Sequence, residues 1–329
     1  MKIIIEKNKI PSFKIDKEVS ALAKFLCCII IVLHHYAQYA IISGKSSDIC
    51  TFFLSSQCGY LAVSTFFFLS GYGLNISFSR NRLSFRTYIS KRLAKVYLPA
   101  VVVTILWLII LDLLGVKSIS LPHGNVCYPT LLVGIIQAFC FCFFDSILWF
   151  VKVIVALYVV FYFYKQFNLK QIKYEILVLF LLTVLTILSV CATIGAFAAV
   201  SVPAFFLGIL IGDNSNIIDK KMSWLWGVIS FVLSLTVVGE LNTFMHGLMS
   251  FFTLLFLIYI FSYFKIENVG TPKIFGDLSY DIYLIHNKVK NLIIYYTDSL
   301  SFLSFVFCTT IVVLGYYYIK KIFHLNKFI

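Results

Sequence analysis

The stretch ALAKFLCCIIIVLHHYAQYAII, Ala21 to Ile42, decides the fold of this chain. About 20 mostly apolar residues span the hydrocarbon core of a bilayer as a helix. Inside this run lie Lys24 and His35, and ionisable side chains at such positions are costly enough to mark functional sites. On a helix these two lie within about 20° of each other, whereas His34 lies about 80° away. The spacing predicts that Lys24 and His35 share one helix face, roughly 16 Å apart along the axis.

The composition of the whole chain is typical of a membrane protein. Of its 329 residues, 61% are hydrophobic and 12% are charged, and the mean hydropathy is +0.96. Soluble proteins contain about 25% charged residues. The formal net charge of +13 does not indicate a nucleic-acid partner, because excess Lys and Arg in a membrane protein usually marks the cytoplasmic loops. Channels, transporters, polymerases and intramembrane enzymes all have this composition, so it does not separate them.

The distribution of Lys and Arg predicts the topology. Residues 1–19 form a basic, cytoplasmic lead-in, and residues 80–95 form the densest basic loop. Segment 131–144 is apolar but too short to span, so we expect a re-entrant or interfacial piece. Most of the 27 basic residues are then cytoplasmic, as the positive-inside rule requires, and so are both termini. The expected spans are residues 20–42, 59–78, 97–114, 147–164, 174–193, 196–212, 223–239, 243–264, 275–296 and 300–319.

These patterns predict an all-α fold, a polytopic membrane helical bundle of about ten transmembrane helices. The bundle forms a single domain, residues 1–329. The N-terminal segment is too polar for a cleavable signal, so the first span is expected to act as an uncleaved anchor. No metal-site spacing such as a paired CxxC is present, and no metal is expected.

Two interpretations of the first span stay open at this point. In one, Lys24 extends its ammonium to the inner interface and His35 forms hydrogen bonds within the bundle. In the other, a base near mid-depth is aligned with a cation at the cytoplasmic end. That alignment suits a reaction between a cytoplasmic donor and an acceptor reached from the other side. Histidine is the usual group for removing a proton from a hydroxyl.

The second span and the loop after it also allow two interpretations. Ser70, within FFFLSG, and its glycine neighbour are small enough to let helices approach closely. In the loop, Lys91, Arg92 and Lys95 either set the topology or recognise phosphates beside the membrane, because Arg and Lys suit multiply charged phosphate groups.

Polar residues in two later spans are further candidates. Trp149 opens a span at the expected outer interface, where tryptophan is commonly an anchor. Lys152 lies about one turn further, so it either extends outward or lines a polar cavity. Tyr283 and His286 are three residues apart, within contact on a helix. They form either a polar seam between helices or part of a binding site.

Five motifs, in order along the chain, resemble those of the acyltransferase-3 family of integral membrane acyltransferases. These are Lys24 with His35 (the family's Arg or Lys, ten residues, His), Phe66 to Tyr72 (FFxxSG), Tyr88 to Pro99 (a basic stretch ending in proline), Leu148 to Phe150 (a Trp motif) and Ser279 to His286 (SYxIYLxH). The chain also departs from the family, because lysine replaces the commoner arginine at positions 24 and 95. Lys152 stands where some relatives carry a carboxylate.

The resemblance implies transfer of an acyl group, most often acetyl from acetyl-CoA, to a hydroxyl of a cell-surface glycan or a lipid-linked sugar. It implies a multi-pass enzyme of the cell inner (cytoplasmic) membrane that modifies envelope polysaccharide. His35 would be the catalytic general base or a transient acyl carrier, with Lys24 beside the inner mouth. CoA would be bound by Lys91, Arg92, Lys95 and Ser70.

The acceptor would be bound by Trp149, Lys152, Tyr283 and His286. Lys152, with lysines 288 and 290, favours an anionic glycan or a lipid pyrophosphate. The alternative is a glycan polymerase or a flippase-like transporter without CoA chemistry, although polymerases usually carry a large outer loop. Membrane lipid is an expected partner, and a homo-oligomer is left open.

Overall fold

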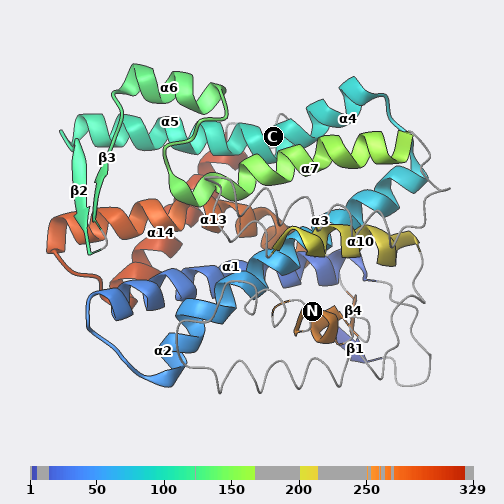
Figure 1. Cartoon of the computed structure of the whole chain (residues 1–329), viewed down its shortest axis with the longest axis horizontal. Helices are drawn as coiled ribbons and strands as arrows, with labels where there is room; N and C mark the ends of the chain where they lie inside the picture. Colours follow the sequence, from blue (N-terminus) through green and yellow to red (C-terminus); the bar gives the residue numbers. More distant parts are fainter. Residues whose placement is uncertain are drawn as a thin grey trace. The chain divides into compact units, whose positions relative to one another are not determined.

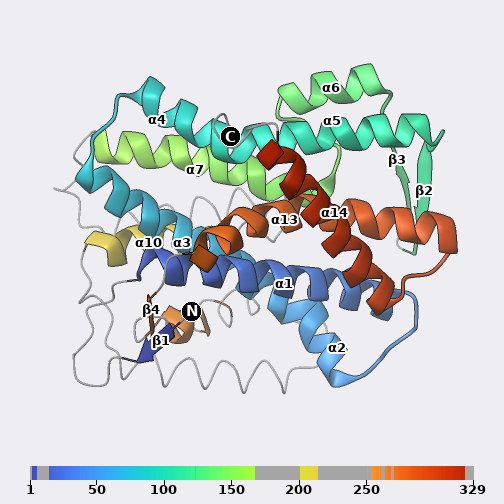
Figure 2. The same cartoon turned by 180° about the vertical axis from the view of Figure 1, so that it is seen from behind.

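The structure is a computed structural model that describes residues 2–5, 15–122, 124–166, 201–213, 250, 253–258, 260, 264–267 and 270–322. In this part the chain is mostly helical, as predicted (Figures 1 and 2). Five helices in it are long and apolar enough to cross a membrane, namely Lys17–Ile42, Ile49–Arg80, Phe85–Leu113, Ser146–Gln166 and Phe302–Ile322. The protein is therefore a multi-pass membrane protein. The predicted spans 174–193 and 223–239 lie outside the described residues, and 243–264 mostly does.

The chain divides into two compact units, and the first comprises residues 1–82 and 170–279. A two-stranded antiparallel sheet joins its N-terminal strand to a strand near residue 265, which the all-α prediction did not anticipate. The elements of this unit are β1 (Lys2–Ile5), α1 (Lys17–Ile42), α2 (Ile49–Phe53), the π-turn η1 (Leu54–Cys58), α3 (Gly59–Arg80), α10 (Pro203–Asp213), β4 (Phe264–Glu267) and the start of α13 (Gly270–Thr297).

Helices α3 and α10 pack so closely that only glycine fits at two positions. A Cβ on Gly71 would overlap the carbonyl oxygen of Phe205, and a Cβ on Gly208 would overlap that of Phe68. Small residues let helix backbones approach in membranes, where dispersion contacts replace the hydrophobic effect. The interpretation of the glycine after Ser70 as a close-approach residue is therefore confirmed.

The second unit comprises residues 83–169 and 280–329. Its helices come from the middle and the end of the chain, and an antiparallel hairpin follows its first long helix. Its elements are α4 (Phe85–Arg92), the π-turn η2 (Leu93–Tyr97), α5 (Leu98–Leu113), β2 (Ser118–Leu121), β3 (Gly124–Cys127), α6 (Leu131–Phe139), the 3-10 turn η3 (Ser146–Leu148), α7 (Trp149–Gln166), the rest of α13 and α14 (Phe302–Ile322).

The hairpin covers the C-terminal end of α5. Trp107 of α5 forms a buried cluster with Val116 and Ile119 of the hairpin segment. Tyr128, just after β3, packs edge to face on Trp107, with the ring centroids 6.1 Å apart. Burial raises the pKa of Tyr128 to about 12, so its hydroxyl keeps its proton at neutral pH.

Helix α6 runs back along α5 in the opposite direction. A Cβ on Gly134 would lie within van der Waals overlap of the Leu108 side chain, so the two helices touch there. Further along, the Tyr97 hydroxyl donates to the carbonyls of Ala138 (2.7 Å) and Phe139 (2.9 Å). With nine residues, α6 is only about 13 Å long, less than the roughly 30 Å of a hydrocarbon core. The re-entrant placement of segment 131–144 remains a prediction.

Two π-turns interrupt otherwise continuous long helices, and the second, η2, lies within the predicted basic motif Tyr88 to Pro99. Turn η1 leads into α3, and η2 joins the basic loop to α5. Pro99 lies in the first turn of α5. Proline has no N–H group to donate a backbone hydrogen bond. The wider π-turn before it accommodates this gap in the series of helical backbone hydrogen bonds. Such π-turns occur frequently at functional sites.

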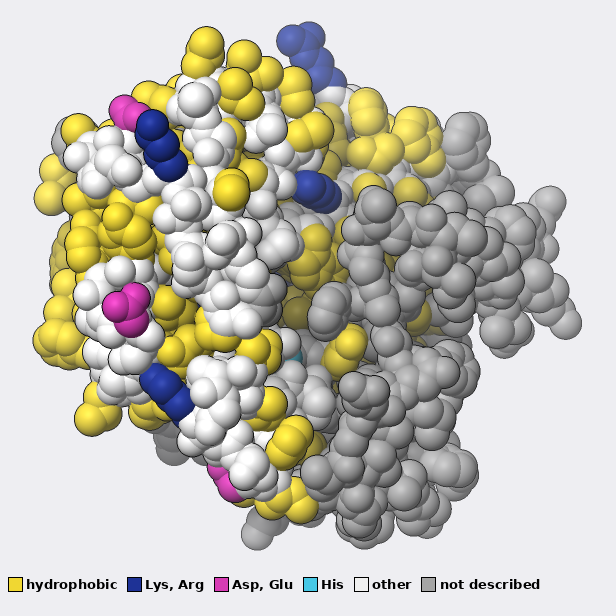
Figure 3. Space-filling view, turned by 60° about the vertical axis from the view of Figure 1, so that its left-hand side comes forward, with side chains coloured by type: hydrophobic (Ala, Val, Ile, Leu, Met, Phe, Trp, Pro, Cys, Tyr) yellow, Lys and Arg dark blue, Asp and Glu magenta, His cyan; other side chains and the backbone are white. Residues whose placement is uncertain are grey.

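The described surface is rich in hydrophobic side chains. Figure 3 shows broad hydrophobic areas with isolated charged side chains between them. On α14, Leu303 and Phe307 are among the most exposed large side chains, at 77% and 66%. A helix that exposes such residues suits contact with lipid acyl chains.

Candidate active site

The two histidines of α1 have different environments. His34 is buried, at 6% exposed, and its Nδ1 lies 2.8 Å from the Leu54 carbonyl oxygen in η1. A Cβ on Gly59 would lie only 2.6 Å from the His34 ring, so the imidazole packs against this glycine. His34 therefore supports the junction between α1 and the π-turn.

His35 is half-buried on a different face of α1. Its Nδ1 lies 3.0 Å from Oε1 of Gln38, one turn further along. With Oε1 of Gln38 as the acceptor, the Nδ1 of neutral His35 is the donor and Nε2 carries the lone pair. This is the tautomer that a general base acting through Nε2 requires.

Helix α1 is unbroken from Lys17 to Ile42, so the predicted angular relation holds. Lys24 is half-buried on the same face as His35, about three turns before it. The roughly 16 Å between them along the axis excludes a direct hydrogen bond. Ser70 of α3 is also half-buried. Any role of Lys24 in the chemistry of His35 therefore acts through a ligand that reaches both.

The basic motif lies in the second unit, at the junction of α4 and η2. The guanidinium of Arg92 lies over the rings of Tyr88 and Tyr158, at 5.6 Å and 6.0 Å from the centroids. Lys91 and Lys95 are exposed. Arg92 is thus held by aromatic contacts, whereas the two lysines present their ammonium groups at the surface of this unit.

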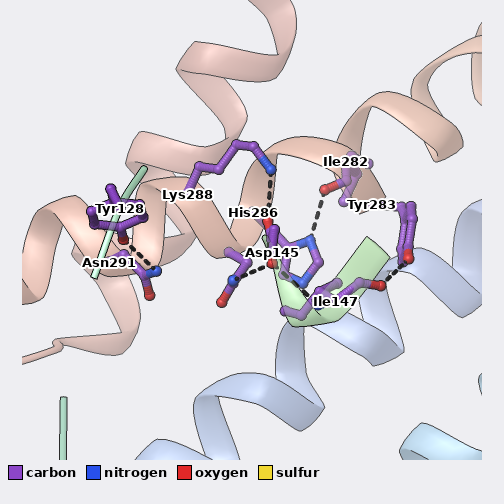
Figure 4. Close-up of polar contacts among 9 residues, drawn as sticks. Tyr128, Asp145, Ile147, Ile282, Tyr283, His286, Lys288 and Asn291 are labelled. Atoms are coloured by element: carbon purple, nitrogen blue, oxygen red, sulfur yellow. Dashed lines mark hydrogen bonds and ion pairs between the residues drawn. The ribbon is translucent and has the colours of Figure 1, made fainter. Parts of the chain in front are cut away.

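A line of polar residues runs along α13, with a spacing of four residues. Residues four apart on a helix share a face, and each of these donates to a residue from the segment between β3 and α7 (Figure 4). The contacts are Tyr283 Oη to the Ile147 carbonyl, Asn287 Nδ2 to Asp145 Oδ1 at 3.4 Å, and Asn291 Nδ2 to Tyr128 Oη at 3.3 Å.

Asp145 and Lys288 form a buried ion pair beside this line. Lys288 Nζ lies 2.8 Å from Asp145 Oδ2, and the two side chains are 6% and 9% exposed. Asp145 Oδ1 also accepts a hydrogen bond from the Ile147 amide at 3.1 Å, which caps the turn before α7. Sequence reasoning missed Asp145. An acidic residue directly before an apolar span, at an N-cap position, was the available signal.

The four predicted acceptor residues differ in exposure. His286 is fully buried and its Nδ1 lies 2.9 Å from the Ile282 carbonyl oxygen of its own helix. Tyr283 is buried as well. Trp149 is half-buried at the first position of α7, and Lys152 is exposed, with Nζ 3.5 Å from the Phe143 carbonyl.

The structure brings the Trp motif and the late motif together. The ring of Phe150 lies 5.6 Å from that of Tyr283. In the same unit, Lys320 of α14 binds Asp281 through both carboxylate oxygens at 2.6 Å. Two motifs more than 100 residues apart in the chain therefore form one packed region.

One comparison with known proteins gives a match. A family model described as an acyltransferase domain, Acyl_transf_3, matches residues 20–321. No curated protein and no solved structure matches the chain. The matched region includes all five motifs and residues of both units.

Proposed function

The chain belongs to the acyltransferase-3 family, and from this membership we propose that it transfers an acyl group, most often acetyl, from acyl-CoA to a hydroxyl. The acceptor is a cell-surface glycan or a lipid-linked sugar, and the donor binds from the cytoplasm. The observation that carries the proposal is the Nδ1 contact of His35 with Gln38, since it leaves the lone pair on Nε2.

In a direct transfer, His35 acts as the general base. Nε2 takes the proton of the acceptor hydroxyl, the hydroxyl oxygen attacks the thioester carbonyl, and the carbon–sulfur bond breaks. The departing CoA thiolate then takes the proton from the imidazolium. In the alternative, Nε2 itself attacks the thioester and the resulting acyl-imidazole passes the acyl group to the hydroxyl. Both routes need neutral His35 and end with an ester and free CoA.

Cationic side chains support binding of the CoA phosphates. Lys91 and Lys95 are exposed at the start of the long helix that contains α5, where the positive-inside rule places the cytoplasm. Arg92 adds a positive charge, and its guanidinium is held over the ring of Tyr88. Lys24, near the cytoplasmic end of α1, and Ser70 are proposed to contact the donor from the first unit.

We place both termini in the cytoplasm, in a bundle of about ten spans in the inner membrane. The pairing of β1 with β4 supports this topology, because the predicted topology puts both strands on the cytoplasmic side. The hairpin of β2 and β3 follows the C-terminal end of α5, which the same topology places outside.

Segment 131–144 is proposed to enter the membrane as a re-entrant or interfacial piece, and the following helix α7 to cross it. Phe141 stacks on Tyr97 at 3.9 Å, whereas Phe144 packs on Tyr128 at 5.9 Å. Tyr97 directly precedes α5 and Tyr128 packs on Trp107 within it, so the connection between α6 and α7 lies beside α5, at an intermediate depth. Irregular backbone at such depth is tolerated where protein covers it. The number of crossings, and hence the orientation, stays as predicted from charge.

The test uses purified protein with radiolabelled acetyl-CoA and an extract of surface glycan. Release of CoA together with label on the glycan supports the proposal, and His35→Ala should abolish both while the protein still inserts. Unchanged labelling by the His35→Ala variant would contradict the assignment of His35. A wild-type protein that neither binds CoA nor transfers label would favour the polymerase or transporter.

A further inference from the structure

The structure distinguishes the three lysines, at positions 152, 288 and 290, that favour an anionic acceptor. Lys288 is neutralised by Asp145 at 2.8 Å. Lys152 is exposed on α7. Lys290 is buried, and no described carboxylate lies within ion-pair distance of it, although the charge of Asp145 is near enough to attract it. Of these three lysines, Lys290 therefore has the unusual environment, because it is buried without a described ion-pair partner.

Lys290 is 8% exposed. Among the residues that the structure describes, no carboxylate forms an ion pair with it and no group forms a side-chain hydrogen bond with it. A buried charge without a partner is strongly unfavourable. Ionisable residues in such positions in membrane proteins mark binding sites or pathways. An anionic ligand would remove the cost of burying this ammonium group.

Two amides on the same part of α13 add hydrogen-bond acceptors. Asn287 and Asn291 are 9% and 6% exposed. Their nitrogens donate to Asp145 and Tyr128, but their carbonyl oxygens have no hydrogen-bond partner in the described part of the chain. Asn287 is three residues before Lys290, so the two are neighbours on the helix surface. Amide oxygens accept hydrogen bonds from hydroxyls.

We propose that Lys290, Asn287 and Asn291 form an acceptor subsite for an anionic, hydroxyl-rich ligand. The ammonium binds a carboxylate or phosphate group, and the two amide oxygens accept from hydroxyls. This chemistry fits an acidic sugar, or a sugar on a lipid pyrophosphate. The inference rests on the proposed acyl transfer, because it assigns the acceptor of that reaction. Lys288 has no direct role in this subsite, since Asp145 already neutralises it.

Binding is measured first, without any acyl donor, by calorimetry on the purified full chain in detergent. The probes are methyl β-glucuronide, which carries a carboxylate, methyl β-glucoside, its neutral counterpart, and geranylgeranyl pyrophosphate, which has no sugar. We expect at least one anionic probe to bind and the glucoside to bind more weakly. The anionic probe that binds identifies the source of the charge. Binding of the glucoside as tight as that of the anionic probe that binds, or no binding of either anion, overturns the proposal.

Substitutions then test Lys290 itself. Lys290→Met should weaken binding of the anionic probe about tenfold, the size expected for losing a charge-assisted hydrogen bond, and Lys290→Arg should largely retain it. The matched control is Lys117→Gln, which removes an exposed charge from the segment between α5 and β2 and should change nothing. Undiminished binding by Lys290→Met contradicts the subsite.

The sign of the stability change separates binding from a structural role. Without ligand, Lys290→Met should unfold at the same temperature as the wild type or a higher one, because it removes an unpaired buried charge. A marked decrease in the unfolding temperature would show that Lys290 is paired within the protein, and would overturn the inference.

Transfer from labelled acetyl-CoA is scored separately. Transfer to the glucoside as efficient as to the glucuronide would leave the enzyme intact and reject the subsite, whereas anion binding without any transfer would reject only the proposed function.

Discussion

The two units of this protein satisfy their polar side chains in different ways. In the first unit, His35 contacts Gln38 three residues away and His34 contacts Leu54 twenty residues away. In the second unit, Lys288 reaches Asp145, 143 residues away, and the contacts of Tyr283, Asn287 and Asn291 span similar distances. The first unit also has long-range contacts, but those of Gln57 with Ser250 at 2.9 Å and of Asn75 with the Ile209 carbonyl at 3.0 Å are neutral hydrogen bonds. In the described part of the second unit, by contrast, charged groups pair, Lys288 with Asp145 and Lys320 with Asp281.

This difference predicts different consequences of mutation. A local contact such as that of His35 sets the proton position on one ring without holding two distant segments together. A buried ion pair holds distant segments together, and removing one partner leaves an uncompensated charge. Substitution of His35 should therefore change chemistry, and breaking the pair of Asp145 with Lys288 should change stability.

The largest expected effect is on catalysis, in the first unit. His35→Asn keeps a donor near the position of Nδ1 and removes Nε2, so acyl transfer should fall by about 10²-fold or more while unfolding in detergent is unchanged. His34→Asn is the matched control, because it can still donate to the Leu54 carbonyl. Both are measured by CoA release. A larger loss of activity in His34→Asn would reverse the assignment of the two histidines.

The next effect is on stability, in the second unit. Asp145→Asn or Lys288→Met should each lower the free energy of unfolding by about 3–5 kcal/mol, because each leaves one buried charge without its partner. The double variant should recover most of that loss. Chemical unfolding in detergent gives all three values. Additive losses in the double variant would show that the two residues act independently.

A smaller effect is expected where α3 meets α10. Gly71→Ala places a methyl group against the Phe205 carbonyl and should cost about 1–3 kcal/mol of overpacking. Gly73 in the same helix faces open space, so Gly73→Ala should be neutral or stabilise by about 0.5–1 kcal/mol. Equal effects at both positions would argue against close packing of these helices.

The smallest effect concerns one hydrogen bond in the second unit. The Tyr280 hydroxyl donates to the Val96 carbonyl within the π-turn η2. Tyr280→Phe should lower the free energy of unfolding by about 1 kcal/mol, whereas Tyr295→Phe, on the exposed end of α13, should not change it. A loss at Tyr295 as large as that at Tyr280 would show that the method does not resolve single contacts.

Much of the fold followed from local pattern. The first span, the start of a helix at Trp149 and the helix over 275–296 were predicted, and α1, α7 and α13 are found there. The two short sheets were missed, because each pairs strands of only four residues. The antiparallel course of α6 along α5 was also beyond prediction, since it depends on contacts of a tyrosine 41 and 42 residues away in the chain.

The candidate site divides in the same way. The sequence alone determined that Lys24 and His35 share a face and that His34 does not, because the helical period follows from backbone hydrogen bonds between near neighbours. It did not determine which lysine Asp145 neutralises. That depends on Asp145 meeting Lys288 rather than Lys290, a pairing between distant segments that exists only once the chain before α7 packs on α13.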